Sequence, residues 1–297
     1  VFDPGVQDRI RSTIRTLIAR HIDNRNCLGY YFLDIPTWHT QFNRTKPGGS
    51  YVDFIRALEP QSAGSKAYVT FLKKRYAEDI AAFNKTYELD AKSFDDLALK
   101  DITDKAIDSE IIAADDELFL NEIAETYYSV AAAETRRLDP NHLILGDRFM
   151  ADSAKTHDSI LKTAAKYVDV ISFQPMGTHN LLGDYIDKVH ALTGKPVLLG
   201  DVNCVLERPA KDLVDTEPYE RAVGEHTQAY YLDAASRPSL IGIHRCTIRD
   251  YQPWNMQFFR RGLLKADDTP YPIMSEYTRQ VSASVFDMVY GKTAPQE

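Results

Sequence analysis

The chain has 297 residues, of which 44% are hydrophobic and 26% charged, as in an ordinary soluble globular protein of one large domain or two smaller ones. Asp and Glu outnumber Lys and Arg by 43 to 35, which argues against nucleic acid or an anionic membrane surface as a partner. No apolar run approaches the roughly 20 residues of a membrane-spanning helix, and no signal peptide is recognisable.

The first elements are a helix and a strand. Asp3 can cap a helix whose first turn holds Pro4, and apolar residues follow at helical spacing as far as Ile18. Residues 29–34 are then expected to form a buried strand, which Pro36 ends because proline cannot donate to a sheet.

The region that follows this strand is expected to be a long helical insertion, over about residues 35–138 of a single domain that spans 1–297. A loop over 35–50 is long enough to line a site. Short helices are predicted over 51–114, and Asp115 or Asp116 is expected to start a long helix that ends before Pro140.

From there on strands and helices alternate regularly. Strands are predicted at 143–148, 168–174, 197–201 and 239–245, and helices near 153–166, 181–193, 219–235 and 273–289. This order is typical of right-handed βαβ units around a parallel sheet. The predicted class is α/β, a (β/α)8 barrel that lacks its first three strands in this chain; an open sheet is the alternative, since only five strands are visible and a closed barrel needs eight.

Polar residues stand at or near the carboxyl end of each predicted strand, where such barrels build their active sites. They are Asp34, Asp147, Arg148, Gln174, Asp201 and His244. This pattern favours an enzyme.

The three cysteines are too few for a disulfide framework. Cys204 and Cys246 follow consecutive strands, so they either form one bridge or are two half-buried thiols. With Asp201 and His244 they offer metal-ligand types, but the spacing matches no known zinc motif, so we expect no metal. Phosphate-binding glycine loops and a serine-hydrolase elbow are also missing, and no cofactor is expected.

Five segments, spread over nearly the whole chain, resemble consecutive segments of a known protein family in the same order. They are residues 29–38 (GYYFLDIPTW), 139–148 (DPNHLILGDR), 167–174 (YVDVISFQ), 193–201 (TGKPVLLGD) and 241–244 (IGIH). They resemble barrel strands four to eight of agarase-like and β-galactosidase-like glycoside hydrolases. By this resemblance the chain is expected to begin after the third strand.

The resemblance implies two catalytic glutamates, and the chain departs at both positions. The acid/base, expected within an Asn-Glu pair, is replaced by Ile35 and Pro36 after Asp34, and the nucleophile of the seventh strand is replaced by Asp201. We hypothesise that Asp34 and Asp201 form the catalytic pair. Their shorter side chains would widen the gap between the carboxyls, which favours inversion. Glu207 is a candidate replacement acid.

The predicted substrate-binding residues divide into two groups. The ring side chains on loops are candidates for stacking on sugar, against simple packing: Trp38, His39, Tyr251 and Trp254. The polar strand-end residues each have two interpretations. Arg148 binds substrate or pairs with Asp147, Gln174 binds a sugar hydroxyl or a neighbouring strand, and His244 assists in the site or is a core histidine.

Taken together, the sequence predicts a glycoside hydrolase that acts on a poly- or oligosaccharide, a galactan such as agar by family analogy alone. The alternatives are a catalytically inactive carbohydrate-binding barrel, a carbohydrate lyase on the same scaffold, and a fragment inactive without its missing strands. The expected partner is a carbohydrate and the expected location secreted or periplasmic. The sequence does not determine the oligomeric state.

Overall fold

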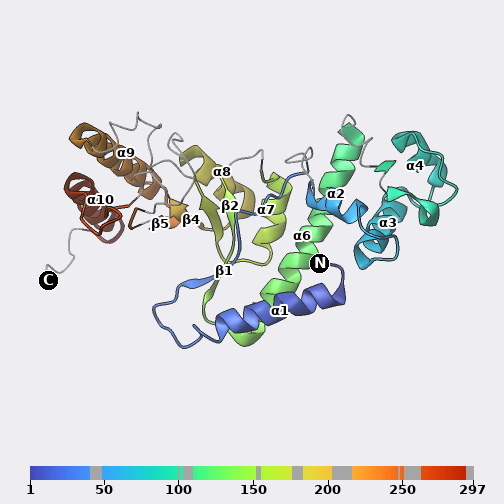
Figure 1. Ribbon diagram of the computed structural model, residues 1–297, viewed down its shortest axis with the longest axis horizontal. Helices are drawn as coiled ribbons and strands as arrows, with labels where there is room; N and C mark the ends of the chain where they lie inside the picture. The colour runs from blue at the N-terminus through green and yellow to red at the C-terminus, as the bar shows by residue number, and fades with distance from the viewer. Residues whose placement is uncertain are drawn as a thin grey trace. The chain divides into compact units, whose positions relative to one another are not determined.

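The computed structural model describes residues 1–40, 49–99, 101–102, 110–151, 155–175, 183–202, 216–246, 248–250 and 262–291. Its elements are shown in Figure 1. In chain order they are α1 (Pro4–Ile18), β1 (Gly29–Asp34), α2 (Tyr51–Arg56), α3 (Ala63–Arg75), α4 (Ile80–Tyr87), η1 (Phe94–Asp96), α6 (Glu110–Leu138), β2 (Leu143–Met150), α7 (Asp158–Ala165), β3 (Ile171–Gln174), α8 (Gly183–Thr193), β4 (Val197–Val202), α9 (Glu217–Ala235), β5 (Leu240–Arg245) and α10 (Pro272–Tyr290).

The described strands form one sheet in the order β1-β2-β3-β4-β5. Strands β2 to β5 pair in parallel, with Arg148 opposite Ser172 and Leu199 opposite Ile243. Each predicted strand is present, and the predicted α/β class with a parallel sheet is confirmed. Whether three strands are missing stays a prediction.

The chain divides into two compact units. Unit 1 comprises Val1–Phe32, Pro36–Gly146 and Asp152–Asp169, and unit 2 comprises Leu33–Ile35, Asp147–Ala151 and Val170–Glu297. The boundary falls inside β1 and inside β2, so both strands contribute residues to each unit. A single domain over 1–297 stays a prediction.

In unit 1, α1 packs against α6, as Figure 1 also shows. Asp3 caps α1 by accepting a hydrogen bond from the Val6 amide, as the sequence predicts. The apolar face of α1 then buries Ile14 and Ile18 in a cluster with Tyr30. The apolar spacing that predicts α1 in the sequence therefore also forms the face by which the helix packs.

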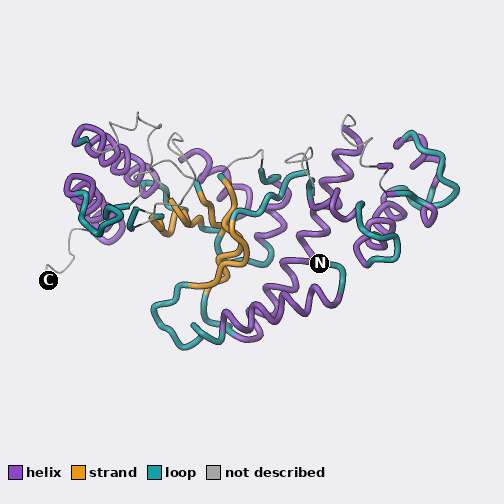
Figure 2. Tube along the Cα trace, viewed as in Figure 1, coloured by secondary structure: helices purple, strands orange, loops and turns teal. Residues whose placement is uncertain are grey.

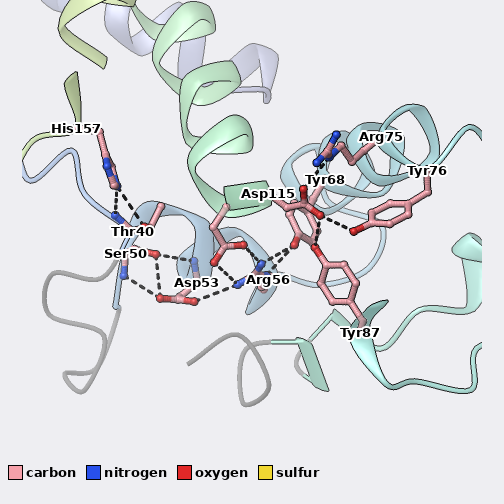
Figure 3. Close-up of polar contacts among 11 residues, drawn as sticks. Thr40, Ser50, Asp53, Arg56, Tyr68, Arg75, Tyr76, Tyr87, Asp115 and His157 are labelled. Carbon is pink, nitrogen blue, oxygen red and sulfur yellow. Dashed lines mark hydrogen bonds and ion pairs between the residues drawn. The ribbon is translucent and has the colours of Figure 1, made fainter. Parts of the chain in front are cut away.

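The long helix α6 corrects one prediction. It begins at Glu110, and Asp115 and Asp116 lie inside it, fully buried, instead of capping its start. Figure 3 shows the reason: Asp115 accepts hydrogen bonds from side chains of α3 and α4 and from Tyr76, which follows α3. Asp116 is paired with Arg56 of α2. Carboxylates with such partners can be buried in mid-helix.

In unit 2, every residue of β3 is buried, and so is every residue of β4 except Asp201. Helices α9 and α10 lie side by side (Figure 2). Val223, Tyr271 and Met274 form a hydrophobic cluster there. The Glu220 carboxylate accepts hydrogen bonds from the Ile273 and Met274 amides, which fixes the start of α10.

Candidate active site

The predicted site residues of unit 2 come from all five strands. Asp34 ends β1, Gln174 ends β3, Asp201 is next to last in β4, and His244 is next to last in β5. Arg148 lies two residues before the end of β2, because that strand continues to Met150. The sequence thus placed these side chains on the correct elements.

Arg148 joins the two predicted catalytic aspartates. One guanidinium nitrogen, Nη2, lies 2.8 Å from Asp34 Oδ1, and the other, Nη1, lies 3.1 Å from Asp201 Oδ2. These contacts and the width of a guanidinium place the two bonded carboxyl oxygens no more than about 8 Å apart. Two acids that are 167 residues apart in the chain, at positions 34 and 201, therefore converge on one cation.

Asp201 is the more enclosed of the two acids, with a side chain 12% exposed against 59% for Asp34. Its Oδ2 also accepts a 2.6 Å hydrogen bond from Gln174 Nε2. Its Oδ1 is buried and has no hydrogen-bond partner among the described residues. A carboxylate oxygen in this state can accept a hydrogen bond from a ligand.

The backbone at both acids is unusual. Asp201 has a φ of +74°, a left-handed conformation that non-glycine residues rarely adopt, and Ile35, which follows Asp34, has a φ of +42°. The Ile35 amide donates to the Arg148 carbonyl at 3.1 Å. Arg148 therefore fixes this segment through its backbone as well as through its side chain. Strained backbone of this kind often accompanies functional residues.

The charge of Arg148 also acts on His244 of β5. Desolvation by the surrounding protein, and then the positive charge of Arg148, lower the pKa of the exposed His244 below its ordinary value of 6.5. The imidazole is therefore neutral near neutral pH, with one nitrogen able to donate a hydrogen bond and the other able to accept one. That state suits a ligand with hydroxyl groups.

Asp147 differs from its neighbour Arg148. It is fully buried, whereas the Arg148 side chain is a quarter exposed, because successive residues of a strand point to opposite faces. Asp147 therefore lies among buried residues of the strand, and its role in substrate binding stays a prediction.

Two predicted ring residues lie in unit 1. Trp38 is 2% exposed, and its ring packs on Tyr51, Tyr127 and Tyr128. This is the packing alternative, and a ring so enclosed has no face for a sugar. His39 stacks on His157, with ring centroids 3.9 Å apart. No local sequence signal indicated His157.

Several predictions fall on residues that the structure does not describe. Tyr251, Trp254, Glu207 and Cys204 lie outside the described residues. In the described part of the chain, no three His, Cys, Asp or Glu side chains are grouped so as to hold a metal ion. Nor is any helix in that part long and apolar enough to cross a membrane.

Comparisons with known proteins give a consistent set of relatives. The chain is 24% identical over 302 residues to β-agarase B of Vibrio sp. (strain JT0107), an alignment that covers 98% of this chain and 31% of that protein. A solved exo-β-agarase matches with a TM-score of 0.80 at 21% identity, covering 98% of this chain and 39% of the other. The agarase AgWH50C matches with a TM-score of 0.76 at 20% identity, covering 97% and 41%. No protein-family profile matches the chain.

The chain spans about a third of the length of the curated relative that it matches. Within that span the predicted resemblance to agarase-like proteins is confirmed in both sequence and three-dimensional structure. The chain therefore has the fold of the solved agarases and is similar to β-agarase B over nearly all of its own length.

Proposed function

We propose that the chain is the catalytic barrel region of a glycoside hydrolase that acts on an agar-like galactan, with Asp34 and Asp201 as its two acids. The relatives named as agarases support the reaction class and the substrate class. The single observation that carries the proposal is the pair of contacts that Arg148 makes with Asp34 and Asp201. These contacts place the two bonded carboxyl oxygens within about 8 Å of each other. Pairs of carboxyls at such separations cleave glycosidic bonds.

The roles follow from the position and environment of each acid. Asp34, in its protonated form, gives its proton to the glycosidic oxygen as the bond from that oxygen to the anomeric carbon breaks. Asp201 takes a proton from a water molecule, whose hydroxyl adds to the anomeric carbon from the opposite face. Arg148 holds both carboxyls in this structure, and its contact with Asp34 has to open before Asp34 can reach the glycosidic oxygen. This route inverts the anomeric configuration.

Binding of the sugar falls to the other polar groups of unit 2. Gln174 orients Asp201 through its amide nitrogen, and neutral His244 can bond to a hydroxyl group. Tyr251 and Trp254 are proposed as stacking residues from the sequence alone.

The test is hydrolysis of agarose oligosaccharides by the full 297-residue chain and its variants. Asp201→Asn and Asp34→Asn should each lower the rate by roughly 100- to 10,000-fold, the usual contribution of a general acid or base. Asp187→Asn is the matched control, because Asp187 pairs with Arg237 elsewhere in unit 2. Unchanged activity in Asp201→Asn rejects the assignment, and proton NMR of the first product shows whether the anomer is inverted or retained.

One observation favours a second candidate, a barrel that binds the carbohydrate without cleaving it. Arg148 occupies the space between the two carboxyls and bonds to both of them. A glycosidic bond cannot lie between the two acids while Arg148 stays there. Micromolar binding of the oligosaccharides by calorimetry, with no product after long incubation, would support this candidate. An unsaturated product that absorbs ultraviolet light would instead indicate a lyase.

A further inference from the structure

Unit 1 contains a histidine cluster that the proposed function does not use. His157 precedes α7 and faces the segment Pro36–Thr40, which follows β1. Its side chain is 16% exposed and Thr40 is 1% exposed. Figure 3 shows the His157 ring pointing at Thr40, with two contacts between them.

The hydrogen bonds of His157 require a neutral ring. The Thr40 backbone amide donates to His157 Nε2 at 3.2 Å, and an amide nitrogen can only donate. Nε2 must therefore carry no proton, and the proton of the neutral ring is on Nδ1, which lies 3.3 Å from Glu117 Oε2. Protonation at Nε2 would place two donors against each other and leave the buried Thr40 amide without its acceptor.

The groups around His157 act in opposite directions. Glu117 of α6 and Asp158 of α7 favour the protonated ring by their charge. Burial opposes them and is the largest effect, so the pKa of His157 is below its ordinary value of 6.5. The His39 ring, stacked at 3.9 Å and almost parallel, would repel a charged His157 when it carries a proton itself.

The same histidine fastens the Pro36–Thr40 segment. Its backbone amide donates to the Trp38 carbonyl at 3.0 Å, and Trp38 forms a parallel bridge with Thr156. Glu117 is held in place in turn by the Ser159 hydroxyl at 2.6 Å. These contacts connect the segment, which lies directly after Asp34 and Ile35 in the chain, to the start of α7.

We propose that His157 is an acid-sensitive latch, which holds the Pro36–Thr40 segment while its ring is neutral and releases it when the ring is protonated. The latch is closed above the ordinary pKa of histidine. A group whose pKa is lower in the folded state than in the unfolded state loses its stabilisation as the pH falls, so the segment opens below about pH 6.5.

The buried ring of Trp38 reports on this opening. The chain has two tryptophans, so a Trp254→Phe background leaves Trp38 as the sole indole. Its emission should shift to longer wavelength in one titration step between about pH 8 and about pH 4.5, with a midpoint below 6.5. Far-UV circular dichroism, recorded in parallel, should stay constant through that step.

Three variants in the same background give the decisive comparison. His157→Gln, whose amide oxygen can still accept from Thr40 but does not titrate, should abolish the step. Glu117→Gln should move the midpoint to lower pH, because it removes a charge that favours protonation. His190→Gln is the matched control, since His190 bonds to the Lys195 carbonyl in unit 2, and should leave the step unchanged.

The proposal is overturned if the emission does not change in this range, or if the step persists unchanged in His157→Gln. Loss of helix with the same midpoint also counts against it, because the change would then be global unfolding. If His157→Gln does not fold, nitrogen NMR of the imidazole in the unaltered chain gives the same answer. Nε2 must be the unprotonated nitrogen at pH 8 and must gain its proton together with the Trp38 shift.

Discussion

A single glycine, Gly146, sets the backbone conformation of β2 just before its site residues. Gly146 directly precedes Asp147 and Arg148, has a φ of +68°, and would bring an added Cβ atom to 2.9 Å from a Val168 methyl group. Only glycine adopts this backbone without strain, and only glycine leaves room for Val168. The position of the Arg148 guanidinium therefore depends on a residue that carries no side chain.

Gly146→Ala should lower the free energy of unfolding by about 2–5 kcal/mol, which combines the cost of a left-handed alanine with that of overpacking. Gly194→Ala is the matched control: its φ is +67°, but nothing lies within 4 Å of its added Cβ. That variant should cost only about 1–2 kcal/mol. Urea unfolding of both measures the difference, and equal losses would show that contact with Val168 does not matter.

At the scale of elements, buried charges join the helices of unit 1. Arg56 of α2 and Asp116 of α6 are both fully buried and paired, with Arg56 Nη1 3.1 Å from Asp116 Oδ2. Arg56 also donates to the Tyr68 hydroxyl at 3.0 Å. Such a pair helps to specify which helix faces lie together, because either charge would be strongly destabilising if it were buried against an apolar neighbour.

Asp116→Ala should destabilise the fold by about 3–5 kcal/mol, because it leaves the Arg56 charge buried without its main partner. The double variant Arg56→Met, Asp116→Leu should regain most of that loss. Asp95→Ala is the surface control, since the Asp95 side chain is 75% exposed in its ion pair with Lys73, and should cost less than about 1 kcal/mol. Guanidinium chloride would screen charges, so urea titration is the appropriate measurement; a double variant no better than the single one would contradict this account.

The elements also show what the sequence could predict. Strand β4 is recognisable because Asp201 is its only polar residue and the others are buried, and α1 is recognisable because its cap and its apolar spacing agree. Asp115 and Asp116 resembled a helix start because acidic residues favour caps, and their partners lie on other elements. Trp38 was ambiguous for the same reason: only tertiary packing decides whether a loop aromatic is buried.

For the site, the sequence placed Asp34, Arg148, Gln174 and Asp201 on neighbouring strands, since parallel strands bring their carboxyl ends to one edge. It could not show that Arg148 bonds to both acids, because that depends on side-chain direction and on the bend at Ile35. Nor could it show that Asp147 is fully buried while Arg148 is partly exposed, because burial depends on the elements that pack around the strand.

For the whole molecule, the open question is whether the two units unfold together. The unit boundary cuts β1 between Phe32 and Leu33 and β2 between Gly146 and Asp147, inside hydrogen-bonded strands and not in linkers. Independent domains are normally joined by exposed linkers that few contacts cross. Because the boundary lies within two strands, we expect the chain to unfold as one cooperative unit; the single domain itself stays a prediction.

Differential scanning calorimetry of the 297-residue chain should accordingly show one transition, with equal calorimetric and van't Hoff enthalpies. For a chain of this length the enthalpy near 60 °C should be about 200 kcal/mol. Two independent units would instead give two peaks, each with roughly half of that enthalpy. Gly146→Ala then separates the cases further: it should shift the whole transition if folding is cooperative, and only one of the peaks if the units unfold separately.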